Sequence, residues 1–152
     1  MTNYEQLKLS NQLCFPLYVC SKEVVRKYKP LLDRLDLTYT QYITMMAMWE
    51  HEQLSAKELG TILYLDSGTL TPVLKTLEKK GFVERQRSKN DERSLIISLT
   101  PSGMALQEQA VSVPEEMVKC IDMDMEDLKT LHRLLHKFME TSIDNGSCKS
   151  SI

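Results

Sequence analysis

Leu65-Asp-Ser-Gly-Thr-Leu-Thr-Pro-Val-Leu-Lys-Thr-Leu-Glu-Lys-Lys-Gly81 is the stretch of sequence that decides the fold. Asp66 and Ser67 can accept hydrogen bonds from the free N–H groups of a helix's first turn, and Gly81 is suited to end that helix. An apolar stripe with helical spacing lies between them, on Leu70, Leu74 and Leu77. The opposite face carries hydroxyls and then lysines: Thr69, Thr71, Lys75, Lys79 and Lys80. Such a helix could rest on a phosphate backbone and read base edges with its first turn, although an ordinary amphipathic surface helix has the same pattern.

A second short helix is predicted immediately before this stretch. Ser55 and Glu58 form a capping-box pattern, with Leu54 and Leu59 placed as a hydrophobic staple. The helix should end near Leu63, so that only a tight turn separates it from the next one. Two short helices joined in this way predict a helix-turn-helix.

Two strand-like runs follow, at residues 82–87 and 94–99, with a polar, turn-rich loop at 88–93 between them. A hairpin directly after the second helix is typical of a wing. Helix, turn, helix and wing in this order indicate a domain that binds duplex DNA.

The distribution of charge agrees with that function better than the total does. The whole chain of 152 residues has a formal net charge of −2. Residues 75–93 hold seven basic and four acidic residues, a net of +3, whereas residues 104–146 hold four basic and nine acidic, a net of −5. Phosphate contacts depend on local positive charge, and a distant acidic half is compatible with them.

Long amphipathic helices are predicted on both sides of this domain. One runs from about residue 11 to 32, and Pro16 requires that it either starts near Leu13 or bends there. Thr38 and Gln41 form another capping box, which starts a mostly buried helix through Ile43, Met46, Met48 and Trp49. The methionines Met45, Met46 and Met48 are expected to fill the core.

Two further helices are predicted after the wing. Thr100 should cap a helix with Pro101 in its first position. One apolar face continues along it, interrupted by a kink at Pro114: Leu106, Ala110, Val113, Met117 and Ile121. The last helix covers residues 124–143, with an apolar seam on Leu128, Leu131, Leu135 and Phe138. His132 and His136 on this helix are spaced like metal ligands, but no Glu follows the first His, and a solvated face is the preferred interpretation.

These elements predict a mainly α fold with a small β-hairpin wing (α+β), in a single structural unit. Residues 37–100 form the winged helix-turn-helix lobe, and residues 147–152 a flexible tail. The seams at residues 1–36 and 101–146 exceed what a small lobe needs for its own core. We therefore expect a helical dimerisation region there, with packing within one chain as the alternative.

The chain shows no signal-peptide pattern and no apolar run near the ~20 residues that span a bilayer, so we expect a cytoplasmic protein that does not contact a membrane. In that compartment the four cysteines are expected to be free, metal-bound or redox-active. Cys14 and Cys20 would lie ~9 Å apart on one helix, too far for a disulfide, and Cys20 is predicted to pack in an apolar face. We predict no cofactor and no metal site.

Four motifs together resemble the MarR family, and specifically its organic hydroperoxide resistance regulators: Asn11-Gln-Leu-Cys-Phe-Pro-Leu-Tyr18, Leu37-Thr-Tyr-Thr-Gln-Tyr42, Tyr64-Leu-Asp-Ser-Gly-Thr-Leu-Thr-Pro72 and Asp91-Glu-Arg-Ser94. The similarity covers roughly residues 8 to 140. It implies a winged helix-turn-helix homodimer that represses transcription from a pseudo-palindromic double-stranded DNA operator. The resemblance also implies release of that operator when an organic hydroperoxide oxidises a cysteine.

The resemblance implies a role for individual residues. Cys14 matches the peroxide-reacting cysteine, and Tyr28 and Tyr39 match the tyrosines that hydrogen-bond its sulfur, with Tyr18 as a third candidate. Arg93 matches the wing-tip arginine that enters the minor groove. The candidate DNA-binding residues are Ser67, Thr69, Thr71, Pro72, Lys75, Arg85, Arg87, Lys89, Asp91 and Arg93.

Elementary chemistry constrains this redox site. The thiolate is the form that attacks peroxide, and hydrogen bonds from phenolic hydroxyls would favour it. Tyr28 lies fourteen residues after Cys14, about 21 Å along a continuous helix, so the two cannot touch within one chain. The site is therefore expected to form across a dimer interface.

The partner of oxidised Cys14 stays open at this point. A sulfenic acid on Cys14 could condense with Cys120 of the other subunit, at about the place where some family members carry a resolving cysteine. Alternatively Cys120 is a small core residue and a low-molecular-weight thiol caps Cys14, while Cys148 on the tail competes. Two alternative functions are a regulator that senses a small aromatic or phenolic ligand between its lobes, and a thiol enzyme. The sequence lacks the Cys-x-x-Cys and βαβ patterns of thioredoxin-like enzymes, so we do not expect an enzyme.

Overall fold

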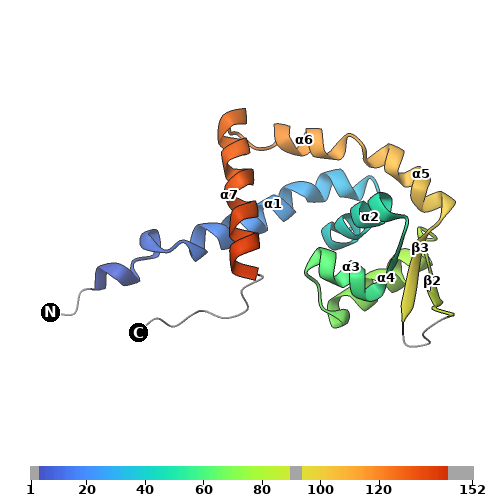
Figure 1. The fold of residues 1–152 in the computed structure, drawn as a ribbon. Coiled ribbons are helices and arrows are strands. Elements are labelled where there is room, and N and C mark those ends of the chain that lie inside the picture. Colours follow the sequence, from blue (N-terminus) through green and yellow to red (C-terminus); the bar gives the residue numbers. More distant parts are fainter. Residues whose placement is uncertain (1–3, 90–93, 144–152) are drawn as a thin grey trace. The chain divides into compact units, whose positions relative to one another are not determined.

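Helices make up most of the chain, and one small sheet lies among them (Figure 1). The computed structural model describes residues 4–89 and 94–143, which divide into a unit ending at Val118 and a second unit beginning at Lys119. The elements before the wing are the short 3₁₀ helices η1 (Tyr4–Leu7) and η2 (Leu9–Asn11), then α1 (Cys14–Asp33), α2 (Tyr39–His51), β1 (Gln53–Ser55), α3 (Ala56–Leu63) and α4 (Ser67–Lys79). The wing and the remaining helices are β2 (Val83–Arg87), β3 (Leu95–Leu99), α5 (Pro101–Ala110), α6 (Val113–Lys119) and α7 (Met125–Ile143).

Helix α1 starts at Cys14 and continues for 20 residues. Pro16 therefore falls in the first turn, where the N–H group that proline lacks would have no intrahelical acceptor. Of the two predicted outcomes for Pro16, the helix start is the correct one. Pro30, close to the other end, does not interrupt the helix.

Side-chain caps start the helices that the sequence predicted. Thr38 and Gln41 form a reciprocal capping box on α2, and Ser55 and Glu58 form one on α3. Asp66 accepts a hydrogen bond from the Thr69 N–H at the start of α4, and Thr100 accepts one from the Gly103 N–H at the start of α5. Each cap satisfies a backbone donor that the first helical turn leaves free.

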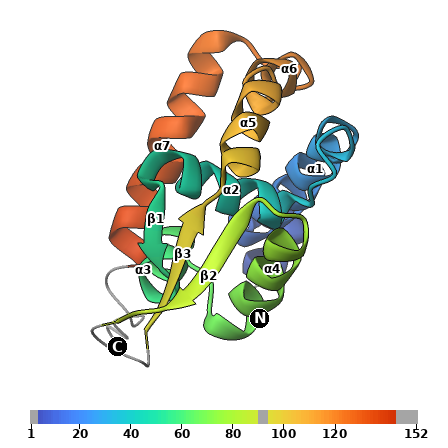
Figure 2. The same cartoon turned by 90° about the vertical axis from the view of Figure 1, so that its right-hand side faces the viewer.

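The wing belongs to a three-stranded antiparallel sheet in the order β1-β3-β2 (Figure 2). Strands β2 and β3 pair from Val83 opposite Leu99 to Arg87 opposite Leu95, which confirms the predicted hairpin. The sequence did not predict β1, which pairs with β3 through Gln53 opposite Ser98. β3 is therefore the central strand, and β2 is an edge strand.

The core of the first unit lies where α4, α3 and α2 meet the sheet. The apolar stripe of α4 is buried there, as predicted: Leu70, Leu74 and Leu77. Met45 and Met48 are completely buried, but Met46 is 45% exposed, so the prediction that Met46 fills the core is wrong. Met46 lies on the side of α2 that faces away from the core, whereas its neighbours Met45 and Ala47 are buried.

The helix after the wing is interrupted more strongly than predicted. α5 ends at Ala110, and α6 begins at Val113, so the expected kink at Pro114 is a break between two helices. Pro114 has no N–H to donate to the carbonyl of Ala110, four residues earlier, which removes a hydrogen bond at the break. The predicted apolar face is nevertheless buried on both sides: Leu106, Ala110, Val113 and Met117.

The second unit consists mainly of α7. The Asp124 carboxylate accepts a hydrogen bond from the Asp127 N–H at 2.8 Å and so caps the first turn. Of its predicted apolar seam, Leu131, Leu135 and Phe138 are exposed and Leu128 is half-buried, and Leu134 is exposed as well. The rings of His132 and His136 lie with their centroids 4.3 Å apart, tilted by 47°, and both are exposed, as predicted.

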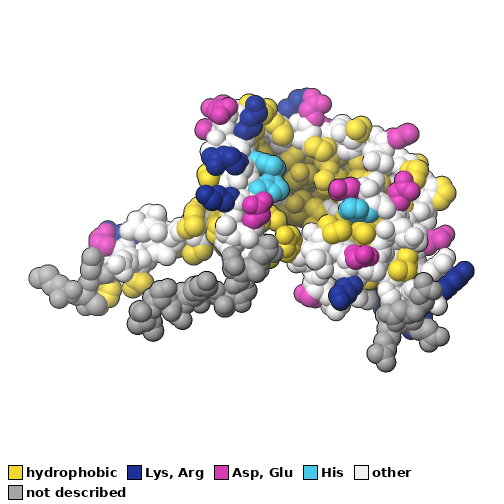
Figure 3. Space-filling view, in the orientation of Figure 1, with side chains coloured by type: hydrophobic (Ala, Val, Ile, Leu, Met, Phe, Trp, Pro, Cys, Tyr) yellow, Lys and Arg dark blue, Asp and Glu magenta, His cyan; other side chains and the backbone are white. Residues whose placement is uncertain are grey.

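The N-terminal elements also leave hydrophobic side chains uncovered, as Figure 3 shows. The exposed apolar residues of α1 and the turn before it are Leu13, Phe15, Tyr18, Val19 and Val25. Cys20, which was predicted to pack in an apolar face, is exposed in the single chain. Over residues 4–89 and 94–143, no helix has the length and apolarity needed to cross a membrane.

Candidate redox and DNA-binding sites

Tyr28 and Tyr39, which lie eleven positions apart in the sequence, are neighbours in the structure. Their ring centroids are 5.2 Å apart, with Tyr28 in the second half of α1 and Tyr39 at the first position of α2. Tyr42, one turn further along α2, adds a third ring 5.8 Å from Tyr28 and lies 6.4 Å from Trp49. The structure thus brings two predicted residues together and adds Tyr42, which the sequence analysis missed.

Burial changes the acidity of these phenols. It raises the pKa of Tyr28, with a further contribution from Tyr39, and it raises the pKa of Tyr42 in the same way. A phenol with a raised pKa keeps its proton at neutral pH, so its hydroxyl remains a hydrogen-bond donor. A cysteine sulfur placed next to this cluster could therefore accept hydrogen bonds from the phenolic hydroxyls, and such bonds favour the thiolate.

Cys14 is not part of that cluster in its own chain. α1 is continuous from Cys14 to Asp33, and fourteen residues of helix separate Cys14 from Tyr28 by about 21 Å. Tyr18 does not join the cluster either, because its exposed ring lies under the Lys22 ammonium, 4.4 Å from the ring centroid. The phenols and the thiol of one chain therefore cannot form a single site.

Three cysteines lie in the described residues, and all three are free and exposed: Cys14, Cys20 and Cys120. Cys14 begins α1, and Cys120 directly follows α6. The predicted competitor Cys148 lies outside the described residues. Within those residues no group of three or more His, Cys, Asp or Glu side chains is arranged to hold a metal ion.

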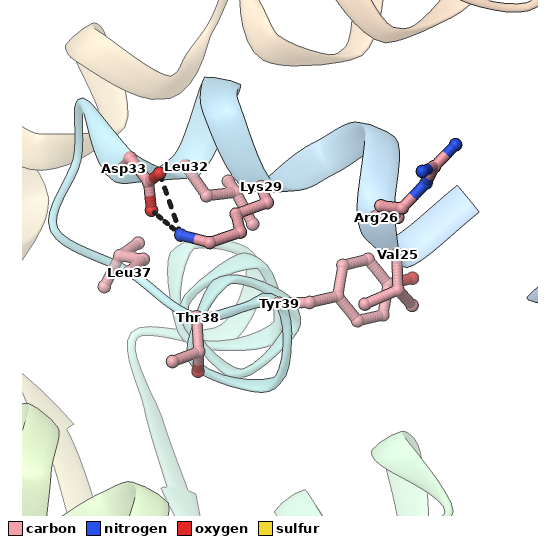
Figure 4. Close-up of a pocket in the computed structure, with 8 residues that line it drawn as sticks. All are labelled: Val25, Arg26, Lys29, Leu32, Asp33, Leu37, Thr38 and Tyr39. Atoms are coloured by element: carbon pink, nitrogen blue, oxygen red, sulfur yellow. Dashed lines mark hydrogen bonds and ion pairs between the residues drawn. The ribbon is translucent and has the colours of Figure 1, made fainter. Parts of the chain in front are cut away.

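A pocket of about 260 Å³ opens beside Tyr39, between α1 and the start of α2 (Figure 4). The Tyr39 ring lies next to Val25 at one end, and Lys29 pairs with Asp33 at 2.9 Å at the other. The lining residues are Val25, Arg26, Lys29, Leu32, Asp33, Leu37, Thr38 and Tyr39. The pocket is mainly apolar, with charged groups at its edge, and so suits an apolar group.

The predicted DNA-reading face of α4 is open to solvent. Its exposed members are Ser67, Thr69, Thr71, Pro72 and Lys75. The cap at the start of this helix is charged, because the Thr69 N–H donates to the Asp66 carboxylate and lowers the pKa of Asp66. Leu70, on the opposite face, is buried, so the hydroxyls and Lys75 point away from the core.

The turn between α3 and α4 depends on a glycine that the sequence analysis did not single out. The Leu65 N–H donates to the Gly60 carbonyl at 2.9 Å, and Tyr64 adopts the left-handed conformation, with φ 54°. A Cβ atom on Gly60 would lie 2.8 Å from the Leu65 carbonyl oxygen. A side chain there would therefore push α3 away from the turn that positions α4.

The basic residues of the wing are not equivalent. Arg87 and Lys89 are exposed near the end of β2, whereas Arg85 is half-buried and forms an ion pair with Glu78 of α4 at 2.6 Å. Glu78 is a partner that the sequence analysis missed. Asp91 and Arg93, at the predicted wing tip, lie outside the described residues.

Comparison with known proteins agrees with this arrangement. Residues 26–110 match the family described as transcriptional regulator SarA/Rot. The chain is 49% identical over 138 residues to the organic hydroperoxide resistance transcriptional regulator of Bacillus subtilis strain 168, which covers 91% of this chain and 94% of that protein.

Solved structures of AbfR from Staphylococcus epidermidis are also similar. The reduced, DNA-bound form has 35% identity and a TM-score of 0.74, covering 90% of this chain and 95% of that one. The disulfide form has 36% identity and a TM-score of 0.62, covering 90% and 91%. These similarities confirm the predicted fold class and family resemblance. The chain belongs to the MarR/SarA family of winged helix-turn-helix transcriptional regulators, among the relatives of the organic hydroperoxide resistance regulators.

Proposed function

We propose that this protein is a redox-sensing transcriptional repressor that binds operator DNA as a homodimer and releases it when an organic hydroperoxide oxidises Cys14. One observation carries the proposal: a continuous α1 holds Cys14 about 21 Å from Tyr28 of the same chain, while Tyr28 and Tyr39 lie together. A second copy in antiparallel orientation would bring its Cys14 to this pair. The sensor is then complete only in the dimer.

The exposed apolar side chains supply the surface for that dimer. Those of α1 and those of α7 are uncovered in the single chain, and uncovered apolar area of this kind typically marks an interface. We assign residues 1–36 and 101–146 to dimerisation and residues 37–100 to DNA binding.

DNA contact follows from the two exposed elements of the winged lobe. α4 would enter the major groove with Ser67, Thr69 and Thr71 near base edges and Lys75 near phosphates, while Arg87, Lys89 and the wing tip reach the adjacent backbone and minor groove. A two-fold dimer presents two such helices to successive major grooves, which explains a pseudo-palindromic operator. AbfR, solved in complex with DNA, supports this use of the fold.

The redox step uses the sulfur as nucleophile. The Cys14 thiolate attacks the outer oxygen of the hydroperoxide, the O–O bond breaks, sulfur becomes a sulfenic acid, and the alkoxide leaves with a proton as an alcohol. The thiol of Cys120 from the other subunit then displaces water from the sulfenic acid and forms a disulfide. The existence of a disulfide form of AbfR supports this second step.

Oxidation is expected to act on DNA binding through the helices that carry the two cysteines. Cys14 starts α1, and Cys120 follows α6, whose Glu116 pairs with Arg34 at the end of α1 at 2.9 Å. A disulfide that moves these helices would change the spacing of the two α4 helices, which duplex DNA fixes at about one turn. We assign the protein no enzymatic activity and a place in the cytoplasm, beside the DNA it binds.

A second candidate function rests on the pocket beside Tyr39. Its volume of about 260 Å³ and its largely apolar lining would suit a small aromatic or phenolic ligand, whose binding could replace oxidation as the signal. In that case Cys14 would be incidental to DNA release.

The test is the affinity of the reduced dimer for the DNA upstream of its own gene, before and after a slight excess of cumene hydroperoxide. We expect the wild type and Cys20→Ser to lose binding and to regain it with dithiothreitol, because Cys20 is exposed on the same helix but takes no part. Cys14→Ser should keep binding throughout. Loss of binding by Cys14→Ser would refute the thiol mechanism, and unchanged binding by the wild type would favour the ligand-sensing alternative.

A further inference from the structure

Arg85 of β2 and Glu78 of α4 form a close, multiply bonded ion pair. The Glu78 Oε2 atom accepts from Arg85 Nη2 at 2.6 Å and from Nε at 2.8 Å, and Oε1 accepts from the Arg85 backbone N–H at 3.3 Å. The Arg85 side chain is 22% exposed and the Glu78 side chain 37%. One carboxylate therefore holds both the side chain and the backbone of the same strand residue.

The position of Arg85 in the sheet explains this arrangement. Along β2, Val83 is buried, Glu84 exposed and Arg85 half-buried, so Arg85 shares the inner face with Val83 while Glu84 points outward. β2 is the edge strand and packs beside α4 (Figure 2). The Arg85 N–H is directed away from β3 and toward α4, where Glu78 satisfies a group that an edge strand would otherwise leave unpaired.

Charge alone suggests a different role for these residues. The sequence groups Arg85 with the cations that could contact phosphate. However, two of the five guanidinium N–H groups of Arg85 are bonded to the Glu78 carboxylate, which holds the guanidinium against α4. Charge-assisted pairs of this geometry are among the stronger hydrogen bonds.

We infer that the Glu78–Arg85 pair fixes the angle of the wing relative to the recognition helix α4, so that Arg85 is a positioning residue for DNA binding rather than a phosphate contact. This inference rests on the proposed DNA-binding function and deepens it. β3 is held on its other side by β1, whereas β2 is the edge strand and meets α4 through the buried Val83 and through this pair. The pair is thus a polar link between the two elements that must meet DNA together.

The direction in which one substitution changes the affinity for DNA distinguishes the two roles. Removing a negative charge from a DNA-binding surface should strengthen binding, because fewer like charges face the phosphates. The positioning role predicts the opposite. Glu78→Gln should bind the upstream duplex at least about threefold more weakly than the wild type does, a loss within the range typical of coupled neighbouring residues. The matched control is Glu84→Gln, which removes the same charge one residue from Arg85 on the outward face and should leave affinity unchanged or higher.

A double-mutant cycle tests Arg85 itself. If Arg85 acts only through Glu78, the Arg85→Gln and Glu78→Gln double variant should bind no more weakly than Arg85→Gln alone. A direct phosphate contact would instead make Arg85→Gln equally costly in either background. Affinity of Glu78→Gln equal to or above wild type, or an equal loss in Glu84→Gln, would overturn the inference.

A readout without DNA keeps this test separate from the proposed function. Hydrogen exchange of the Arg85 amide should become faster in Glu78→Leu, whose side chain has no acceptor, and stay unchanged in Glu84→Leu, because Glu78 accepts that N–H. Unchanged exchange in Glu78→Leu would contradict the pair. Wild-type protein that fails to bind the upstream duplex would count against the proposed function, while the exchange result would still decide whether the pair anchors the wing.

Discussion

The ammonium group of Lys80, directly after α4, donates to the backbone carbonyl of Asp36 in the turn between α1 and α2. It also lies 3.0 Å from the Asp36 carboxylate and 3.4 Å from the Gln41 side-chain oxygen, and its side chain is only 22% exposed. Asp36 adopts a left-handed conformation with φ 52°, and Tyr39 follows three residues later. Lys80 therefore joins the end of the recognition helix to the turn that leads into the tyrosine cluster.

Lys80→Met should weaken the communication between Cys14 and DNA. The methionine keeps the apolar stem but loses the bonds to Asp36, so movement near Tyr39 would be transmitted less well to α4. We expect the ratio of DNA dissociation constants, oxidised over reduced, to be smaller than in the wild type by several-fold, within the range of typical coupling energies. Fluorescence anisotropy with the upstream duplex measures both constants.

Lys79→Met is the matched control for Lys80. It removes the same charge from the neighbouring, exposed position, where the side chain makes no contact with Asp36. Both variants should bind reduced DNA more weakly through loss of charge. If the ratio of the DNA dissociation constants of the oxidised and reduced protein is the same in both variants as in the wild type, Lys80 has no part in the coupling.

Tyr28→Phe and Tyr39→Phe should slow the oxidation of Cys14 while leaving DNA binding by the reduced protein intact. Each substitution keeps the ring packing and removes one hydroxyl donor to the thiolate, and losing one such donor typically lowers a rate by roughly tenfold or more. Stopped-flow measurement of sulfenic acid formation gives the rate directly. Tyr64→Phe, with an exposed ring outside the cluster, serves as the control, and equal rates in all three variants would exclude the phenols from the chemistry.

Cys120→Ser should abolish the disulfide-linked dimer after treatment with hydroperoxide. The Cys14 sulfenic acid would then persist and react with dimedone, because no second thiol displaces water from it. Non-reducing electrophoresis and mass spectrometry of the adduct distinguish the products. An undiminished interchain disulfide in Cys120→Ser would transfer the resolving role to another thiol, which Cys148→Ser identifies.

Gly103→Ala should destabilise the fold. A Cβ atom at Gly103 would lie 2.1 Å from the Phe82 carbonyl oxygen, so α5 must move away from the turn before β2. Overpacking of this kind costs about 1–3 kcal/mol, and it also disturbs the hydrogen bond from Trp49 Nε1 to the Gly103 carbonyl at 2.8 Å. Gly68→Ala is the control, because its added Cβ meets only the Asp66 side chain, at 3.0 Å, and thermal unfolding should rank the two variants accordingly.

The pH dependence of stability should report the Glu78–Arg85 pair. The hydrogen bond from Arg85 holds the pKa of Glu78 below its usual value of 4.5, so the folded state binds this proton less readily than the unfolded state. The stabilisation is then fully present above that value and is lost as the pH falls through the folded pKa. The difference in Tm between wild type and Glu78→Gln should be constant from pH 7 to pH 5.5 and shrink below pH 4.5; a difference that stays constant to pH 3 would contradict it.

Signals contained in a few consecutive residues predicted the fold well. Thr38, Ser55, Asp66 and Thr100 each cap the helix that the sequence assigned to them, because a cap is a local contact between residues three positions apart. β1 escaped prediction because its three residues form a strand only by pairing with β3, more than forty residues later. Their own pattern contains no alternation long enough to indicate a strand.

Only some members of the candidate sites were predictable from the sequence. Tyr28 and Tyr39 entered through the family resemblance, and the fold places their rings side by side. Tyr42 and Glu78 have no local signature, since their roles arise from packing between elements. A basic run does not reveal that Arg85 is neutralised by a carboxylate seven residues earlier on a different element.

The unbroken course of α1 has a genetic consequence under the proposed function. Each protomer contributes its thiol to one sensor and its phenols to the other, so two defective alleles can repair one another. A mixed dimer of a Cys14→Ser chain and a chain with both Tyr28→Phe and Tyr39→Phe places every defect in the same half. The opposite half then joins an intact thiol to intact phenols, so each mixed dimer keeps one of its two sensors. Because random pairing of equal amounts of the two chains makes about half of the dimers mixed, such a cell should recover about a quarter of its fast peroxide sensors.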